Sequence, residues 1–151
     1  VMTLDGRVIS EEIKSINIPA NASTKVYSET IVKLMKGKAK NEIVVVADFI
    51  DDNNKQYSNN YFLLNQKEIN LPEANITYKI QAIDNGYEIT LNSDKFARAV
   101  YLSVDGIDNF FEDNYFDLLP NKEKPISVKT ELSMEDFKNQ IKVISLKDCL
   151  H

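Results

Sequence analysis

The chain has 151 residues, of which 43% are hydrophobic and 27% charged, a mix typical of a globular protein. Its 18 Lys and Arg against 23 Asp and Glu give a net charge of -5, so no basic surface indicates a nucleic-acid partner. No apolar run approaches the roughly 20 residues that cross a bilayer, and we expect no membrane partner.

Residue types that carry common catalytic chemistry are scarce. The single Cys, Cys149, excludes an internal disulfide and a Cys-based zinc cluster. The single His is the last residue, which removes Ser-His-Asp triads and conventional zinc sites from the folded region. The four Gly are too scattered for a phosphate-binding loop. We therefore expect no catalytic residue, no cofactor and no metal in this chain.

The first half of the chain shows short alternating or β-branched segments separated by turn residues. Asp5-Gly6 is a hairpin dipeptide in what resembles the middle of a β-hairpin, so we expect partner strands upstream. The run at 43–49 is the clearest strand, because it is rich in β-branched residues. The other segments of this half are 7–18, 23–31 and the aromatic strand 57–64.

The second half begins near Pro72, which cannot donate to a central ladder and marks a boundary. Residues 76–81 alternate with a period of two, and Asp84-Asn85-Gly86 is a hairpin turn. Ser133 is a candidate N-cap of a short helical turn. The further strands expected are 87–91, 97–104, 125–132 and 141–146.

Strands at intervals of roughly 8–12 residues with turns between them are typical of β-sandwiches. We predict an all-β chain of two tandem immunoglobulin-like β-sandwich domains, residues 1–70 and 71–151. The first is short for the ~100 residues of such a domain, so we expect it to be truncated at its N-terminus. The residues expected to be largely buried are Val44, Val46, Phe62, Ile80, Ile89, Leu91, Val100, Leu102, Phe116, Val128 and Val143.

Acidic residues are abundant, but their spacing selects no pair of glycosidase carboxylates. The segments 51–54 and 105–109 carry oxygen ligands suited to Ca²⁺. Neither fits the calcium-loop pattern that ends in Glu, so polar turns are the favoured interpretation.

The aromatic residues allow two interpretations. Most alternate in phase with Ile, Val and Leu, which favours core packing. Tyr57, Tyr61 and Tyr115 are the candidates for sugar stacking if they are exposed. Arg98 lies within an apolar strand, so we expect it to meet a carboxylate of the 110–117 segment, namely Glu112, Asp113 or Asp117.

Residues 110–122, Phe-Phe-Glu-Asp-Asn-Tyr-Phe-Asp-Leu-Leu-Pro-Asn-Lys, closely resemble a signature of the C-terminal immunoglobulin-like domain of β-mannosidases in glycoside hydrolase family 2. Asn121 stands where that family usually has Gly, and Asn also tolerates the left-handed conformation. The segments 97–100 and 58–72 are similar to that family in the same order. The structural signature residues are Arg98, Asp113, Asn114, Phe116, Asp117 and Pro120.

The resemblance implies a non-catalytic accessory region of a retaining β-mannosidase, an exo-glycosidase that hydrolyses terminal β-D-mannose. The two catalytic Glu of that family lie in a TIM barrel of about 250 residues, which this chain cannot contain. The implied partners are that barrel and other domains of the parent chain, with oligosaccharide as a further candidate. The compartment stays open, and the resemblance is compatible with a periplasmic or secreted parent. A carbohydrate-binding module and a cell-surface spacer or adhesion module stay open as alternatives.

Overall fold

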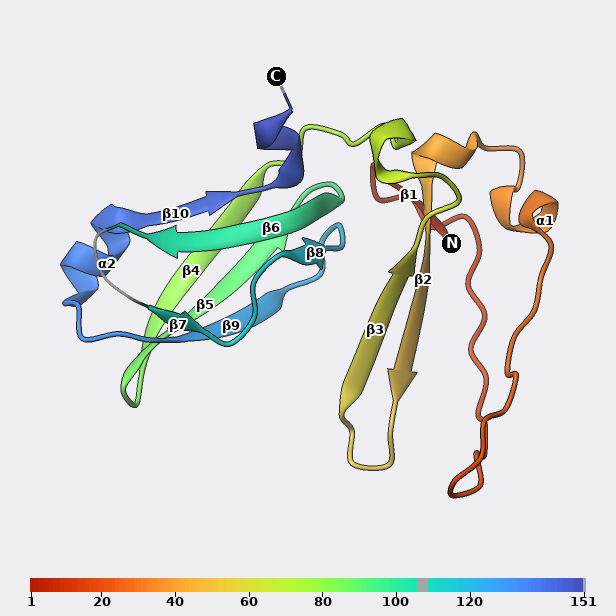
Figure 1. Ribbon diagram of the computed structural model, residues 1–151, viewed down its shortest axis with the longest axis horizontal. Coiled ribbons are helices and arrows are strands. Elements are labelled where there is room, and N and C mark those ends of the chain that lie inside the picture. Colours follow the sequence, from red (N-terminus) through yellow and green to blue (C-terminus); the bar gives the residue numbers. More distant parts are fainter. Residues whose placement is uncertain (106–108, 151) are drawn as a thin grey trace. The chain divides into compact units, whose positions relative to one another are not determined.

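The computed structural model describes residues 1–105 and 109–150. The chain divides into two compact units, which we describe separately (Figure 1). Unit 1 comprises Val1–Thr3 and Arg7–Asn70, and unit 2 comprises Leu4–Gly6 and the chain from Leu71 onward. The described elements are mostly strands with short helices, so the predicted all-β class is confirmed.

Unit 1 contains a three-stranded antiparallel sheet in the order β1-β2-β3. The long β2–β3 ribbon pairs without interruption from Val45 opposite Tyr61 to Ile50 opposite Gln56. The β-branched residues of the predicted run 43–49 explain β2, because they suit a pleated surface. The elements of this unit are β1 (Met2–Thr3), α1 (Ile31–Met35), η1 (Lys40–Glu42), β2 (Ile43–Ile50), β3 (Gln56–Tyr61) and η2 (Gln66–Glu68).

The alternating segments at 7–18 and 23–31 do not form strands, so that interpretation was wrong. Val8 makes a single bridge to Met2, and residues 9–30 have no ladder partner. A strand needs a neighbour for its N–H and C=O groups, which side-chain alternation alone does not supply. The apolar side chains of these segments lie in solvent, with Ile13 89% and Val8 66% exposed.

Unit 2 is a sandwich of two antiparallel sheets, which lie as facing layers in Figure 1. One sheet has the strand order β4-β5-β9-β7 and the other β10-β6-β8. Helix α2 joins β9 to β10. The elements are β4 (Ile76–Ile83), β5 (Gly86–Ser93), β6 (Ala97–Val104), β7 (Phe110–Phe111), β8 (Phe116–Leu118), β9 (Lys124–Lys129), α2 (Met134–Gln140), β10 (Ile141–Ile144) and η3 (Leu146–Cys149).

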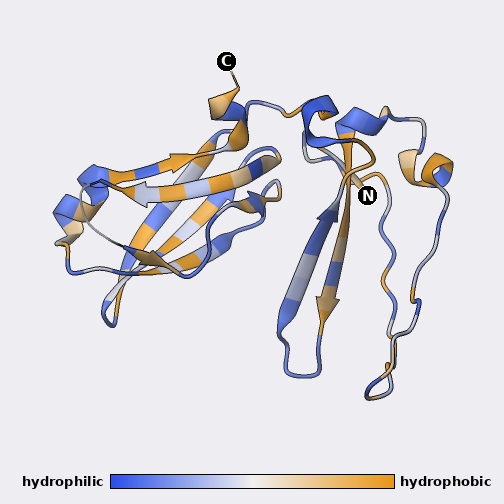
Figure 2. Ribbon diagram, in the orientation of Figure 1, coloured by the Kyte–Doolittle hydropathy of each residue, from blue (hydrophilic) through white to orange (hydrophobic). Residues whose placement is uncertain are grey.

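The core of unit 2 lies between the two sheets. Alternate residues of β5 are buried, and the same alternation appears as apolar and polar bands in Figure 2. Phe137 of α2 is fully buried, and its ring centroid lies 4.8 Å from that of Tyr87. The Tyr87 hydroxyl donates to the Leu132 carbonyl at 2.7 Å, which satisfies the polar end of a buried ring.

Seven of the predicted core residues are buried: Val44, Ile89, Leu91, Val100, Leu102, Phe116 and Val128. The other four, Val46, Phe62, Ile80 and Val143, are only half-buried, so the prediction was too strong for them. Ile80 and Val143 lie on the edge strands β4 and β10, which have a neighbour on one side only. Val46 and Phe62 belong to unit 1, in which no second sheet faces the first among the described residues.

Two local predictions are confirmed in unit 2. The Ser133 side chain accepts the Asp136 N–H at 3.1 Å as the N-cap of α2. Asp84 and Asn85 form the two-residue connection between β4 and β5, with Asn85 in the left-handed region. Gly86 follows with φ +153, where a Cβ would lie 1.9 Å from the Val128 carbonyl oxygen. Only glycine allows β5 to approach β9 so closely at this position.

Replacing Gly86 with Ala should therefore destabilise unit 2 by roughly 2–4 kcal/mol, because the backbone of β9 must move. Gly37 is the matched control. It has φ +81, but no atom lies within 4 Å of the position that a Cβ would take, so Gly37→Ala should cost only the conformational penalty of about 1–2 kcal/mol. Chemical unfolding of each variant, monitored by hydrogen exchange in the two units separately, measures both changes in the free energy of unfolding. Equal losses of stability would contradict this account of Gly86.

Candidate functional site

The segment 110–120 is tied to β6 by the side chain of Asn114. The Asn114 Oδ1 accepts the Leu102 N–H at 2.8 Å, and its Nδ2 donates to the Leu102 carbonyl at 2.9 Å. One carboxamide thus makes both bonds that a strand residue would make opposite Leu102. The Asn114 N–H in turn donates to Asp113 Oδ1 at 2.9 Å. This clamp brings β8 into register with β6, with Phe116 opposite Val100.

Asp117 holds a β-bulge in β6. The pairing of β6 with β8 shifts register between Ala97 and Val100, and Ala99 has φ +48. A bulge leaves an N–H group without a ladder partner, and Asp117 Oδ1 accepts that of Ala99 at 3.0 Å. The other oxygen, Oδ2, lies 3.9 Å from Nη1 of Arg98. Asp117 is therefore the carboxylate that Arg98 meets among the three expected candidates.

The two other candidate carboxylates have different partners. The Glu112 Oε2 accepts the Ser127 N–H at 3.4 Å. The Asp113 Oδ2 pairs with Lys124 Nζ at 3.0 Å. The same ammonium lies 4.7 Å from the ring centroid of Phe116, which is buried. Lys124 thus links Asp113 to the Phe116 ring by a salt bridge and a cation–π contact.

The end of the segment turns through Pro120 and Asn121. Asn121 has φ +57, which confirms that Asn occupies a left-handed position here. Its N–H donates to the Ser93 carbonyl at 2.8 Å. Pro120 packs against Gly6, where a Cβ would lie 2.9 Å from the Pro120 Cβ. The signature residues thus contact the main chain or the core of unit 2, except Arg98, which pairs with the Asp117 side chain. This pattern is typical of a structural role.

The three tyrosines considered for sugar contact are all exposed. Tyr57 and Tyr61, 48% and 61% exposed, lie on one face of β3, and the Phe49 ring lies beside Tyr57 with centroids 6.1 Å apart. Tyr115 in unit 2 is 69% exposed and has φ +61, an uncommon conformation for a bulky residue. Its ring stacks on that of Tyr101 at a centroid distance of 4.8 Å. The structure thus places two exposed aromatic surfaces, one on each unit.

Tyr101 was not among the three candidates. Its place opposite Tyr115 follows from the register of Val100 with Phe116. The sequence alone does not reveal that register, because the bulge at Ala99 shifts the pairing of the two strands.

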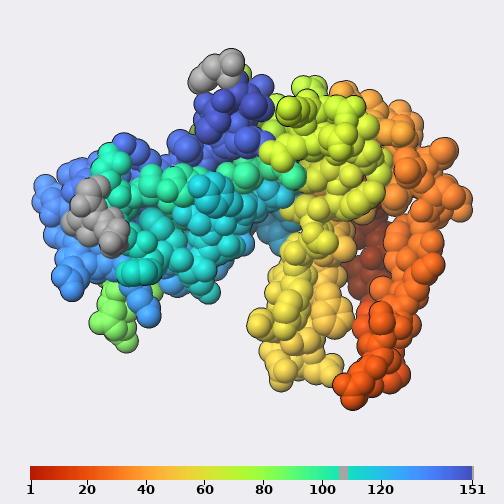
Figure 3. Space-filling view, viewed as in Figure 1, coloured from red at the N-terminus to blue at the C-terminus, as the bar shows by residue number. Residues whose placement is uncertain are grey.

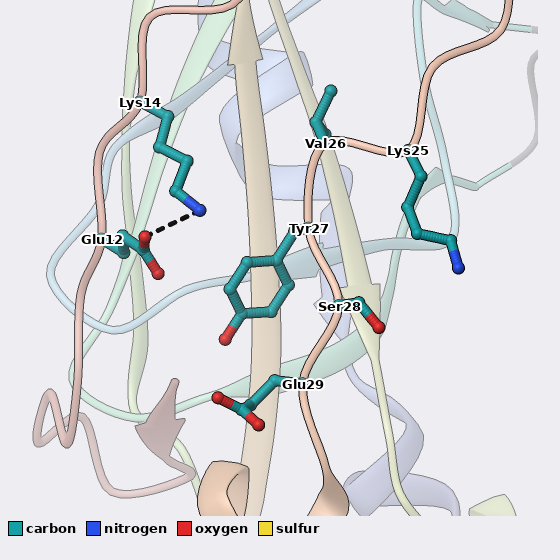
Figure 4. Close-up of a pocket in the computed structure, with 7 residues that line it drawn as sticks. All are labelled: Glu12, Lys14, Lys25, Val26, Tyr27, Ser28 and Glu29. Carbon is teal, nitrogen blue, oxygen red and sulfur yellow. Dashed lines mark ion pairs between the residues drawn. The ribbon is translucent and has the colours of Figure 1, made fainter.

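A solvent-open hollow of about 330 Å³ lies in unit 1 between two extended segments (Figure 4). Tyr27 and Glu29 point from one segment toward Glu12 and Lys14 of the other, whereas Lys25 and Ser28 point away. Lys14 Nζ pairs with Glu12 at 2.8 Å and lies 5.4 Å from the Tyr27 ring centroid. Figure 3 shows that the chain in this part of unit 1 is drawn out rather than folded into layers.

Both ionisable shifts at this hollow favour the charged forms. The pKa of the Glu29 carboxyl is lowered, chiefly because it accepts the Thr30 N–H at 2.7 Å. The pKa of Lys14 is raised, chiefly by its hydrogen bond to Glu12. A general acid of a glycosidase needs a raised carboxyl pKa, and Glu29 is shifted in the opposite direction. The hollow is therefore a groove of paired surface charges.

In the described parts of the two segments considered for Ca²⁺, the Asp side chains have hydrogen-bond or ion-pair partners within the chain. Asp51 Oδ1 accepts the N–H groups of Asn53 and Lys55, each at 2.9 Å, as in an Asx turn. Asp105 pairs with Lys142. Residues 106–108 of the second segment lie outside the described residues. Within residues 1–105 and 109–150, no group of three or more His, Cys, Asp and Glu is placed to hold a metal ion.

None of the helices in those ranges has the length and apolar character of a membrane span.

Comparisons with known proteins match both halves of the chain. A model of the immunoglobulin-fold domain of mannosidases, described as an Ig-fold domain, matches residues 71–149. A model described as a mannosidase Ig/CBM-like domain, in which CBM denotes a carbohydrate-binding module, matches residues 1–68. The chain belongs to the family of mannosidase immunoglobulin-like domains. This confirms the resemblance carried by the 110–122 segment and the prediction of two tandem immunoglobulin-like domains.

A solved structure agrees with this family. The crystal structure of β-D-mannosidase from Dictyoglomus thermophilum superposes with a TM-score of 0.78 at 20% identity. The match covers 96% of this chain and 17% of that mannosidase, so the chain spans less than a fifth of the longer protein. At this identity the likeness shows the fold. None of the curated proteins matches the chain in sequence.

Within the mannosidase immunoglobulin-like domain of unit 2, Asn114→Ala should lower the free energy of unfolding by about 1–2 kcal/mol, because it leaves the Leu102 N–H and C=O without partners. Asn139→Ala is the matched control, since Asn139 is exposed on α2 and Ala favours a helix. Thermal unfolding of the three proteins measures the difference. An unchanged melting temperature of Asn114→Ala would contradict the clamp, and any ligand binding should be unaffected.

Proposed function

We propose that the chain is a non-catalytic accessory region of a β-mannosidase, with domains at 1–70 and 71–151. The observation that carries this proposal is the tandem match of both halves to mannosidase immunoglobulin-like domains. The parent enzyme would be a retaining exo-glycosidase that releases terminal β-D-mannose. Its catalytic TIM barrel and other domains would be the partners of this region.

The surface of unit 1 supports partners of this kind. Large apolar side chains are exposed along residues 8–32 and on the β2–β3 ribbon, with Ile13 89% and Val32 80% exposed. Exposed apolar surface of this extent is typical of a region that packs against another domain, since burial yields about 25 cal/mol per Å². We propose that other domains of the parent chain cover this surface.

The signature residues support a structural rather than a chemical role. Asn114 and Asp117 bond main-chain groups of β6, and Asp113 pairs with Lys124. A catalytic carboxylate must remain available to a substrate, whereas these groups complete the fold. We propose that Arg98, Asp113, Asn114, Phe116, Asp117 and Pro120 maintain the C-terminal sandwich.

Two assays test the accessory role. The chain alone should not hydrolyse 4-nitrophenyl β-D-mannoside, whereas the product of the complete reading frame should. Deleting residues 71–151 from that product should lower its melting temperature and leave the KM of the remaining active enzyme unchanged. Hydrolysis by the chain alone, or a reading frame without a barrel that holds two catalytic Glu, would refute the proposal. A frame of repeated sandwich modules would instead support a cell-surface spacer or adhesion module.

Sugar binding is a second candidate function, favoured by the exposed face of Phe49, Tyr57 and Tyr61 in the domain whose family model is described as Ig/CBM-like. The C–H groups of a pyranose are attracted to the negative face of an aromatic ring. Calorimetric titration with manno-oligosaccharides should then give a heat that Tyr57→Ala and Tyr61→Ala both reduce. Tyr115→Ala tests the other aromatic surface in parallel. A flat trace for the unaltered chain would remove this function.

A further inference from the structure

Strand β4 is a long edge strand with an open side. All its residues, Ile76 to Ile83, pair with β5 without a break, and β4 ends the sheet order β4-β5-β9-β7. Six of the eight residues are exposed. The other edge strand of this sheet, β7, has only two residues.

Natural proteins protect such edges, and β4 has few of the usual protections. Short length, proline, bulges and charged side chains keep edge strands from pairing with other chains. β4 has eight residues, no proline and an unbroken register, and Lys79 is its one charged residue. An edge with these properties favours pairing with another strand.

The main-chain groups that would make this pairing can be assigned. The two-residue connection Asp84-Asn85 places Ile83 and Gly86 directly opposite each other. In a hairpin with a two-residue loop, the two residues that flank the loop form a hydrogen-bonded pair. Hydrogen-bonded and non-bonded pairs alternate along an antiparallel ladder. The odd-numbered residues of β4 therefore bond β5, and Tyr78, Ile80 and Ala82 direct their N–H and C=O groups to the open side.

The core-facing side of β4 is also incompletely covered. Its residues Tyr78 and Ile80 lie opposite Leu91 and Ile89 of β5, both of which are fully buried. Ile80 itself is only half-buried, and Tyr78 is 39% exposed. A strand added at this edge would satisfy the backbone and cover these two side chains together.

We propose that β4 pairs antiparallel with β4 of a second copy of this chain, about a two-fold axis at Ile80. In this register Tyr78 lies opposite Ala82 of the other copy, a large residue against a small one, and Lys79 lies opposite Gln81. The neighbouring register, centred on Lys79, would place two ammonium groups directly opposite each other, which is unfavourable. The outward groups of Tyr78, Ile80 and Ala82 then bond those of Ala82, Ile80 and Tyr78 of the second copy.

Sedimentation of the full chain tests this pairing. The unaltered chain should show a concentration-dependent monomer–dimer equilibrium. Ala82→Pro should shift it to monomer, because proline removes an outward N–H while the bonds to β5 remain. Circular dichroism and thermal unfolding establish that this variant is folded. A chain that stays monomeric up to millimolar concentration, or a folded Ala82→Pro variant with unchanged association, would overturn the proposal.

Changing the charge of Gln81 separates pairing from folding. In the proposed dimer, residue 81 of each copy lies opposite Lys79 of the other copy. Gln81→Lys therefore creates two pairs of like charges, and we expect association about 2- to 30-fold weaker. Within its own sheet Gln81 lies opposite Glu88, so the same substitution should stabilise the monomer slightly. Gln81→Glu should show the opposite pattern. If the association of these variants changed with the stability of the monomer, and not with the charge placed opposite Lys79, this interface would be contradicted.

Disulfide cross-linking determines the register. In a Cys149→Ala background, which removes the exposed native thiol, Lys79→Cys together with Gln81→Cys should cross-link two copies on oxidation. Lys79→Cys alone should not, because residue 79 does not face itself in the proposed register. Cross-linking by the single variant, or none by the double variant, would overturn the register centred on Ile80.

Discussion

The sandwich of unit 2 depends on two side chains that replace strand hydrogen bonds along β6. Asn114 makes both main-chain bonds opposite Leu102, and Asp117 accepts the N–H of Ala99 at the bulge. Strand β8 has only three residues and pairs with β6 on either side of an irregularity. Without these two side chains, β8 would pair with β6 only at the two positions on either side of the irregularity. Phe116 and Leu118 enter the core because that strand is held there.

The two units differ in how much of the apolar surface of their strands is buried. In unit 2 two sheets share a contiguous core that includes Ile89, Val100 and Phe137. In the described part of unit 1, a three-stranded sheet leaves one apolar and aromatic face to solvent. Beyond the two residues that pair with β1, the sheet is the two-stranded ribbon of β2 and β3, and an isolated two-stranded ribbon is only marginally stable in water. The described part of unit 1 therefore keeps apolar surface available for a covering partner, whereas unit 2 has two facing layers around a core of its own.

The sequence predicts those elements whose signals are local. Strand β6 has the predicted bounds 97–104, and the Asn85 turn and the Ser133 cap lie where the residue types require them. Prediction from the sequence fails at 7–18 and 23–31, where side chains alternate but no neighbouring strand accepts the backbone hydrogen bonds. The signature residues are recognisable by resemblance alone. Their roles depend on the left-handed Ala99 and on the register of β6 with β8, which no local pattern encodes.

The carboxylates of this domain illustrate why abundance of acidic residues does not indicate hydrolysis. Asp117 lies beside Arg98 and accepts a main-chain N–H, and Asp113 faces Lys124, so both carboxylates have partners within the fold. The exposed groups differ in kind: they are the rings of Tyr57, Tyr61 and Tyr115 and the open side of β4. None of these is needed to complete the core. Since contacts to a ligand or partner require accessible groups, the interactions of this chain are to be sought on those surfaces and not among its carboxylates.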